Sequence, residues 1–421
     1  MVKPRLQPIL DWLDEQFENW KAEQEFQEHT PEQEAELGVK LHAFLKAAQE
    51  QPIQEYMLER KYNQLHDVYQ PKITRTLFGE EKYTVDKNLT KELRVKSDIW
   101  VPEHPDDYLK LEPELLLTNK NTKWNSVFNA LRLFTSTGEN NNNIGRNLYY
   151  VVRDRVTEKY LGTLNLSSDY LDVACRDSFI GWTREQRNSG QINFTSVGSI
   201  IVPTQPLGYN YVGGKLLSLL LVSDQVQNDW REQYGDPLVG LSTTSFYGSY
   251  SQYTGLKYWK KLGKSMGSSI ARPDPKLYAE IRAWLKWKEP RMYWEWYHAT
   301  DKDGVKIKRD HINRSLAYVY RQFGAKGKDF ITGHQRGIYF CALYTNTKEF
   351  LRGEITEDRL QPRFDNSIET LTELWKSKYA TKRIRSLIER QATLDDVLFY
   401  DDMLFNDWKT IKEKYLPQVG R

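Results

Sequence analysis

The chain has 421 residues, enough for about two to four domains with buried cores. Apolar residues make up 39% and aromatic residues 13%, which excludes a disordered chain. The net charge is +3, and only Cys175 and Cys341 occur, which excludes a disulfide framework and indicates a reducing compartment.

No apolar run reaches the ~18 residues of a membrane span. The densest run, 216–222, is too short, and the N-terminus lacks the apolar stretch of a signal peptide. We therefore expect a cytoplasmic protein without a membrane partner, in the host cytoplasm if a phage encodes it.

Charge is distributed unevenly along the chain. Residues 1–60 carry 13 acidic and 6 basic side chains, whereas residues 257–291 carry 10 basic and 3 acidic ones. A second basic run follows between 306 and 328. Such asymmetry predicts a polyanionic partner, here DNA, and a merely solvated surface is the alternative.

The elements predicted in chain order begin with helices. Apolar residues recur at helical spacing within 4–68, and Thr30-Pro31-Glu32-Gln33 is typical of a capping box that begins a helix. Four prolines in 69–120 indicate a short β or irregular connector. A helix at 124–134 should end before four asparagines at 140–143, which favour a surface loop.

Strands and helices alternate after that loop. Two β-rich runs, 148–154 and 160–166, predict a hairpin. The elements expected next are a helix carrying Tyr170, Leu171 and Ala174, a strand at 199–203, a helix at 211–226, a strand at 237–245 and a last β run at 258–263. This alternation predicts an α/β (α+β) fold, with a mixed central sheet flanked by helices.

The rest of the chain predicts a helix at 311–322, a strand at 337–344 and helices at 368–389 and 394–415. The expected organisation is an acidic helical N-terminal region (1–75), a connector (76–121), an α/β core (122–272) and a basic, aromatic C-terminal region (273–421) that ends in helices.

The central motif is a strand, a loop and a helix N-terminus. Such a terminus exposes unpaired N–H groups and the positive end of the helix dipole, which suits a phosphate. The alternative is that the glycines let the helix pack closely on the sheet. The candidate cofactor-binding residues are Val202, Asn210, Tyr211, Val212, Gly213, Gly214 and Lys215.

A second set of motifs carries a family resemblance. Arg176-Asp177-Ser178-Phe179-Ile180-Gly181-Trp182, before a charged helix start, resembles the DruA family of phage defence. Later landmarks agree in order: Val202-Pro203, Asp229-Trp230, Tyr234-Gly235, Ser245-Phe246, Tyr253-Thr254-Gly255, Tyr258-Trp259, Leu262-Gly263 and Gly267. The similar stretch covers about 120 of the 421 residues, and its tail also resembles Mom-type DNA-modifying proteins.

The resemblance implies a core like that of GNAT acetyltransferases, in which the strand–loop–helix motif holds the pyrophosphate of coenzyme A. It therefore implies an acyl-CoA donor. The family pattern Gln/Arg-x-x-Gly-x-Gly/Ala reads Asn210-Tyr211-Val212-Gly213-Gly214-Lys215 here, so the second glycine is displaced. Tyr258 lies where some GNAT enzymes have a tyrosine that protonates the departing thiolate.

The candidate catalytic residues are Arg176, Asp177, Tyr258 and Ser245. Arg176 and Asp177 could act as an anion clamp and a general base, or could form a buried ion pair that fixes the loop before a helix. Tyr258 could act as an acid beside a cationic lysine, or could be a packed core aromatic.

Aromatic residues interleaved with basic ones suit stacking on an extruded or single-stranded base. The candidate nucleic-acid-binding residues are Lys257, Lys260, Lys261, Lys264, Trp294, Trp296, His311, Arg314, His334 and Arg336. The spacing of His298, His311 and His334 matches no known ligand signature, so we predict no metal site.

The first functional hypothesis is a nucleic-acid-modifying transferase of phage or defence type, which moves an acyl or amino-acid-like group onto a DNA base to give a hypermodified base. One alternative is a non-catalytic DNA-binding defence or anti-defence component. Another is a GNAT-type acyltransferase for a small molecule or a protein.

Overall fold

The computed structural model describes residues 7–69, 72–75, 81–84, 95–119, 121–135, 145–208, 212–246, 251–265, 270–300, 304, 311–331, 335–391 and 403–416. The chain forms two compact units. The helical unit comprises Met1–Pro52 and Ser268–His334, and the sheet unit comprises Ile53–Gly267 and Gln335–Arg421. The second segment of the helical unit is therefore an insertion within the chain of the sheet unit.

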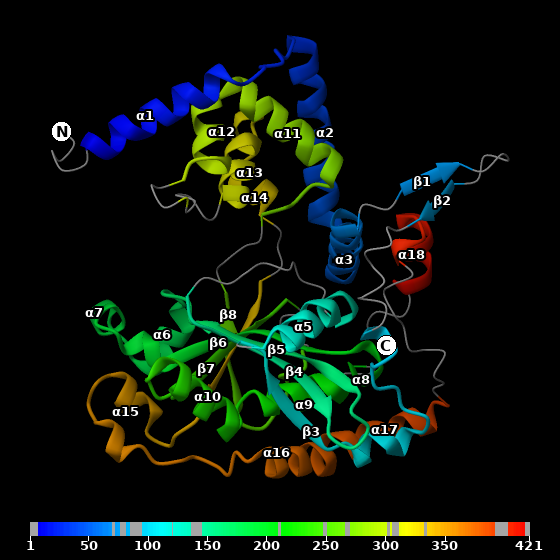
Figure 1. Ribbon diagram of the computed structural model, residues 1–421, viewed down its shortest axis with the longest axis vertical. Coiled ribbons are helices and arrows are strands. Elements are labelled where there is room, and N and C mark those ends of the chain that lie inside the picture. The colour runs from blue at the N-terminus through cyan, green and yellow to red at the C-terminus, as the bar shows by residue number, and fades with distance from the viewer. Residues whose placement is uncertain are drawn as a thin grey trace. The chain divides into compact units, whose positions relative to one another are not determined.

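The helical unit contains α1 (Gln7–Ala22), α2 (Pro31–Glu50), α11 (Pro275–Lys288), α12 (Pro290–Tyr297), α13 (His311–Gln322) and α14 (Gly327–Phe330) (Figure 1). The predicted capping box begins α2. The Thr30 hydroxyl accepts a hydrogen bond from the Gln33 backbone N–H, and the Gln33 side-chain oxygen accepts one from the Thr30 backbone N–H. Leu41 of α2, Trp284 of α11 and Leu316 of α13 share one core. The two segments thus fold together, because each covers the apolar face of the other.

The sheet unit is built on seven strands: β3 (Pro113–Leu117), β4 (Asn147–Asp154), β5 (Tyr160–Ser168), β6 (Thr195–Pro203), β7 (Gly240–Ser245), β8 (Trp259–Lys264) and β9 (Gly337–Ala342). Their order in the sheet is β3-β4-β5-β6-β7-β9-β8. Only β6 and β7 pair in parallel among the described strands, and the other neighbours are antiparallel. A separate ladder joins β1 (Lys72–Arg75) to β2 (Glu81–Thr84).

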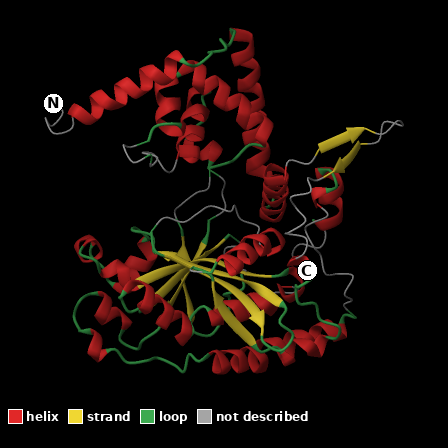
Figure 2. Cartoon of the chain, in the orientation of Figure 1, coloured by secondary structure: helices red, strands yellow, loops and turns green. Residues whose placement is uncertain are grey.

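Helices surround these strands (Figure 2). They are α3 (Ile53–Tyr69), η3 (Pro105–Lys110), α5 (Thr122–Thr135), α6 (Ala174–Ile180), α7 (Arg184–Asn188), η4 (Gln191–Phe194), α8 (Gln205–Gly208), α9 (Val212–Leu220), α10 (Asp224–Tyr234), α15 (Thr347–Leu351), η6 (Glu357–Arg359), α16 (Ile368–Trp375), the π-helical η7 (Lys376–Ala380), α17 (Thr381–Glu389) and α18 (Trp408–Tyr415).

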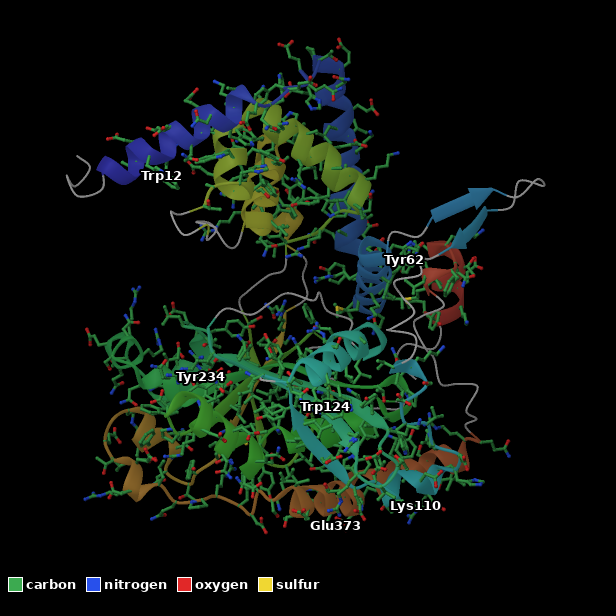
Figure 3. The ribbon with its side chains drawn as sticks, viewed as in Figure 1. Trp12, Tyr62, Lys110, Trp124, Tyr234 and Glu373 are labelled. Atoms are coloured by element: carbon green, nitrogen blue, oxygen red, sulfur yellow. The ribbon has the colours of Figure 1, made fainter. Side chains whose placement is uncertain are left out.

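The sheet has two apolar faces, because consecutive strand residues point to opposite sides. Val152 of β4 packs in one core with α9, α10 and α16, and we call this side the α9 face. Val151 packs in a second core with α3, α5 and α18, and we call that side the α5 face. Tyr234 belongs to the α9-face core and Trp124 to the α5-face core; Figure 3 labels both.

The predicted mixed sheet flanked by helices is confirmed, as are the hairpin β4–β5 and the N-terminal helices. Two details differ. The helix predicted at 211–226 is divided into α9 and α10, because the Ser223 hydroxyl accepts from the Val226 backbone and caps a new helix. Tyr170 and Leu171 lie exposed before α6 instead of inside a helix.

The two compact units cut across the predicted organisation, since residues 1–52 share a core with 268–334. Part of the helix predicted at 394–415 lies outside the described residues, and α18 forms its last part. None of the described helices is both long and apolar enough to cross a membrane.

Candidate functional site

The strand–loop–helix motif is formed by β6, α8 and α9, and its glycines are covered by the chain itself. A Cβ atom on Gly213 would overlap Leu207 Cγ, and one on Gly214 would overlap Gln252 Oε1. Lys215 Nζ donates to the carbonyl oxygens of Gln252 and Thr254 at 2.9 and 2.7 Å. These contacts favour the packing interpretation of the glycines, because neighbouring residues fill the positions that a side chain would take.

Gln252 and Tyr253 also cover the end of β6. β6 and β7 pair only as far as Gly198 and Thr243, and then they part. Gln252 Nε2 donates to the Ile201 carbonyl at 3.1 Å. The Thr243 hydroxyl donates to the buried Tyr253 hydroxyl at 3.3 Å.

The other candidate residues of this motif are described only in part. Val202 is half-buried at the end of β6, the side chain of Val212 is outside the described set, and Asn210 and Tyr211 lie outside the described residues altogether. Burial lowers the pKa of Lys215 to about 8, and the nearby charge of Arg383 acts in the same direction.

Replacing Gly213 with alanine tests the packing role. We expect Gly213→Ala to lower the free energy of unfolding by roughly 1–3 kcal/mol, because the new methyl group overlaps the side chain and carbonyl of Leu207. Gly263→Ala is the control, since its Cβ would meet Cys175 at an ordinary 3.4 Å. Urea titrations measure both, and equal midpoints for the two variants would contradict the packing role.

Arg176 and Asp177 lie in α6, inside a buried ionic network. The Arg176 side chain is 0% exposed; its Nη1 lies 2.7 Å from Asp169 Oδ1 and its Nη2 2.7 Å from Asp177 Oδ1. Arg187 of α7 contacts Asp177 Oδ2 at 2.9 Å, and the Ser242 hydroxyl of β7 donates to Asp169 Oδ1 at 2.7 Å. The network ties α6 and α7 to the sheet, which favours a structural role for the Arg176–Asp177 pair over a clamp and a base.

The structure does not bring the four candidate catalytic residues together. Phe340 of β9 packs with Ile180 of α6, whereas its neighbour Tyr339 packs in the core against which Tyr258 lies. Because Tyr339 and Phe340 point to opposite faces, Tyr258 and the Arg176 network are on opposite sides of the sheet. Ser245 is buried as the last residue of β7.

Tyr258 has an unusual backbone. Its φ is 75°, a value that bulky residues rarely adopt. Its ring stacks on Phe364 with centroids 3.6 Å apart, and Lys257 Nζ lies 5.0 Å from the ring centroid. Backbone strain of this kind is held by packing and is common at functional sites.

The predicted nucleic-acid-binding lysines are exposed on the sheet unit. Lys260, Lys261 and Lys264 lie on β8, which is an edge strand, and Lys257 precedes it. They can contact a polyanion. Lysines on an edge strand also prevent pairing with another chain, so exposure alone does not distinguish the two roles.

The candidates of the helical unit divide into buried and exposed residues. Trp294 and Trp296 are buried at 4% and 9% exposure, and Arg314 is exposed. The side chain of His311 and the whole of His334 lie outside the described residues. The tryptophan rings are therefore packed in this state and offer no free face to a base.

Part of the uneven charge is neutralised within the helical unit. Arg291 of α12 pairs with Asp14 of α1 at 2.7 Å, and Lys288 of α11 approaches Glu34 of α2 at 3.5 Å. Lys40 of α2 pairs in turn with Glu280 of α11. The acidic N-terminal helices thus pair with the last two cations of the basic run, Lys288 and Arg291.

Arg336, directly before β9, has the surroundings of a binding residue. Its guanidinium carbon lies 3.9 Å from the centroid of the Phe246 ring, and in the described part of the chain the group has neither a hydrogen bond nor a carboxylate partner. Burial lowers the pKa of Arg336, and Arg60 also lowers it, whereas Tyr170 and Tyr56 act in the opposite direction.

Arg336 is among the residues predicted from the sequence, whereas Arg60, Tyr56 and Tyr170 are not. Tyr56 and Arg60 are one turn apart on α3, where Arg60 Nη1 donates to the Tyr56 hydroxyl at 3.4 Å. Tyr170 comes from the loop before α6. No local pattern links these segments to residue 336, so no signal in the sequence could have found them. Among the described residues, no cluster of histidine, cysteine and carboxylate side chains is placed to hold a metal ion.

Comparison with known protein families identifies the family of this chain. The family model described as Druantia protein DruA matches residues 108–353. The chain belongs to the DruA family. The match includes the Arg176 network, Tyr258 and Arg336, together with the inserted segment of the helical unit, but it leaves out α1, α2 and α3.

One curated member of this family is the Druantia protein DruA of Escherichia coli (strain UMEA 4076-1). It is 27% identical over 194 residues, which are 42% of this chain and 47% of that protein. The chain therefore spans about half the length of its curated relative. No solved structure matches.

Proposed function

We propose that this DruA family member is a DNA-binding component of phage defence in the cytoplasm, and that Arg336 and its neighbours contact the nucleic acid. The observation that carries the proposal is the state of Arg336: a half-buried guanidinium, stacked on Phe246 and without a carboxylate partner among the described residues.

The chemistry of the group supports a phosphate or a base edge as its ligand. A guanidinium presents five N–H donors in a rigid plane, which match the oxygens of a phosphate or the acceptors of guanine. Stacking on Phe246 fixes that plane, and partial burial strengthens each charge-assisted hydrogen bond. Arg60 supplies a second cation close enough to lower the pKa of Arg336, a repulsion that an anion would relieve.

Replacing Arg336 tests the proposal. We expect Arg336→Ala to weaken binding of a fluorescein-labelled DNA by about tenfold and to reduce the slope of log K against log salt by about one. Arg336→Lys should recover only part of the affinity, because lysine keeps the charge but not the planar fork. Fluorescence anisotropy over a salt series measures both quantities.

Arg363 provides the matched control. It is an exposed arginine near the opposite end of β9, where Nη1 donates to the Ala342 carbonyl. Arg363→Ala should leave DNA affinity within about twofold of the wild type, a change well under 1 kcal/mol. Equal effects of the two substitutions would show that Arg336 contributes only general charge, and no effect of either would refute the proposed site.

A DNA-base-modifying transferase is the second candidate. One observation favours it: a seven-stranded sheet with one parallel pair, β6–β7, is compatible with the GNAT-like core that the family resemblance implies. Nucleoside mass spectrometry of DNA from producing cells tests it, and unmodified nucleosides would reject it. An acyltransferase for small molecules or proteins has less support, because the motif that would hold acyl-CoA is covered by Leu207 and Gln252.

A further inference from the structure

Helix α1 contacts the rest of the helical unit through few side chains. Phe17 is buried, and Leu13 and Trp20 are partly buried around it, in a small cluster with Trp294 and Ala299. The side chains of α1 between these positions are mainly exposed, while Trp12, labelled in Figure 3, is only partly covered. Trp20 also packs against the larger core of the unit. A helix held by so few side chains can leave its surface at a low cost in free energy.

The surface under α1 combines aromatic rings with a cation. We call it the α12 surface and define it by Arg291, Tyr293, Trp294 and His298. The Trp20 ring stacks on Tyr293 at 6.1 Å and lies 5.4 Å from His298, and Phe17 lies 5.7 Å from Trp294. Helix α1 therefore covers part of the Tyr293 and Trp294 rings.

Charge contacts accompany the ring contacts. Asp14 Oδ1 lies 2.7 Å from Arg291 Nη2, and the Arg291 guanidinium lies 4.8 Å from the Phe17 centroid and 5.2 Å from the Trp294 centroid. Helix α1 therefore offers the α12 surface a carboxylate and stacked rings. A single-stranded nucleic acid offers the same two features, as phosphates and bases.

The aromatic surface continues beyond α1. Tyr293 and Tyr297 have centroids 4.9 Å apart, and the Arg282 guanidinium lies 4.6 Å from Tyr297. Arg282 Nη2 donates to the Tyr293 hydroxyl at 2.9 Å, while its Nε is buried without a hydrogen-bond partner. Rings in series with two arginines suit successive stacked bases and the phosphates between them.

We propose that the α12 surface is a binding site for single-stranded nucleic acid and that α1 covers it as an internal competitor. The proposal rests on the proposed function only in that both invoke nucleic acid; the α12 surface is a second site, in the other unit. Release of α1 leaves most contacts of α2 in place, because Leu37, Leu41 and Leu45 pack with α11 and α13 in a core that α1 reaches, among the described residues, through Trp20.

Weakening the cover in the full chain tests the proposal. We expect the double variant Asp14→Asn, Phe17→Ala to bind fluorescein-labelled oligo-dT about tenfold more tightly than the wild type, with a steeper salt dependence. A chain starting at Glu23 should show at least the same gain. Circular dichroism and thermal unfolding confirm that each variant is folded.

Two controls make the result specific. Glu18→Gln removes an exposed charge of α1 outside the buried cluster and should leave the affinity unchanged. Adding Arg291→Ala to the double variant should abolish the gain in oligo-dT affinity, since Arg291 is the cation that loses its Asp14 partner when α1 is released. Oligo-dT affinity within about twofold of wild type in both the double variant and the shortened chain would overturn the proposal.

The two proposals fail separately. If Arg336→Ala has no effect on DNA binding but uncovering α1 increases oligo-dT binding, the Arg336 site is rejected and the α12 surface is supported. If the gain on uncovering persists in an Arg336→Ala background, the two sites are independent. If the gain requires Arg336 and not Arg291, the α12 surface is rejected.

Discussion

Replacing Arg176 with methionine should lower the free energy of unfolding by about 3–5 kcal/mol, because it leaves the buried Asp169 carboxylate without its counter-charge and Asp177 with Arg187 alone. The side chains of Asp169 and Asp177 are 0% and 10% exposed, so water cannot replace the lost guanidinium. Methionine fills much of the apolar volume, which separates the loss of charge from the creation of a cavity. Chemical denaturation, with the slope checked for two-state behaviour, measures the difference.

Two further variants decide how the Arg176 result is interpreted. Arg184→Met changes an exposed arginine in the neighbouring α7 and should alter stability by no more than about 0.5 kcal/mol. Asp169→Asn should cost less in the Arg176→Met chain than in the wild type, since the unpaired charge is then removed. If Arg176→Met costs no more than Arg184→Met, the network does not hold α6 on the sheet.

Replacing Lys61 with methionine should make the protein more stable at neutral pH, with a gain that depends on pH. Lys61 of α3 is 0% exposed, and its ammonium donates to the Arg132 carbonyl at 3.2 Å. Burial lowers the pKa of Lys61 well below its ordinary value of 10.5, and the neighbouring Arg132 charge lowers it further. Among the described residues, no carboxylate contacts its amine.

The direction of the Lys61 effect follows from proton binding. Between the lowered pKa and 10.5 the unfolded chain holds a proton on Lys61 that the folded chain lacks, so lowering the pH through this window destabilises the wild type. Methionine cannot titrate, so the stability of Lys61→Met relative to wild type should rise by roughly 1.4 kcal/mol for each pH unit below 10.5 within the window.

Unfolding curves between pH 8 and pH 10 measure this dependence. Lys123→Met, on the exposed surface of α5, is the control and should parallel the wild type at every pH. A Lys61→Met curve that also parallels the wild type would mean that Lys61 carries its proton in the folded chain.

Local patterns predicted the elements well. The capping box at Thr30 and Gln33 sets the start of α2, and the apolar spacing at 311–322 gives the bounds of α13. Both signals depend on residues three or four positions apart, which lie on one face of a helix. The division of α9 from α10 was missed because Ser223, its cap, lies within an otherwise continuous apolar pattern.

The candidate site was predicted less well, because its contacts join distant segments. Gln252 against Gly214 and Arg60 beside Arg336 follow from the sheet topology, which no local period encodes. The burial of charged side chains was also not predicted. The sequence pattern indicated that Arg176 is catalytic, yet its side chain is completely buried. The acidic N-terminal run suggested no partner within the chain, although Asp14 pairs with Arg291.

The divided helical unit has a consequence for synthesis. Leu37, Leu41 and Leu45 of α2 leave the ribosome early, but the helices that bury them belong to the segment beginning at Ser268. At ~5–20 residues per second, an apolar helix waits on the order of ten seconds or more for its partners while the strands of the other unit emerge. During that interval α2 exposes an apolar face of the kind that ribosome-associated chaperones bind. A shortage of these chaperones should therefore reduce folding of the helical unit more than folding of the sheet unit.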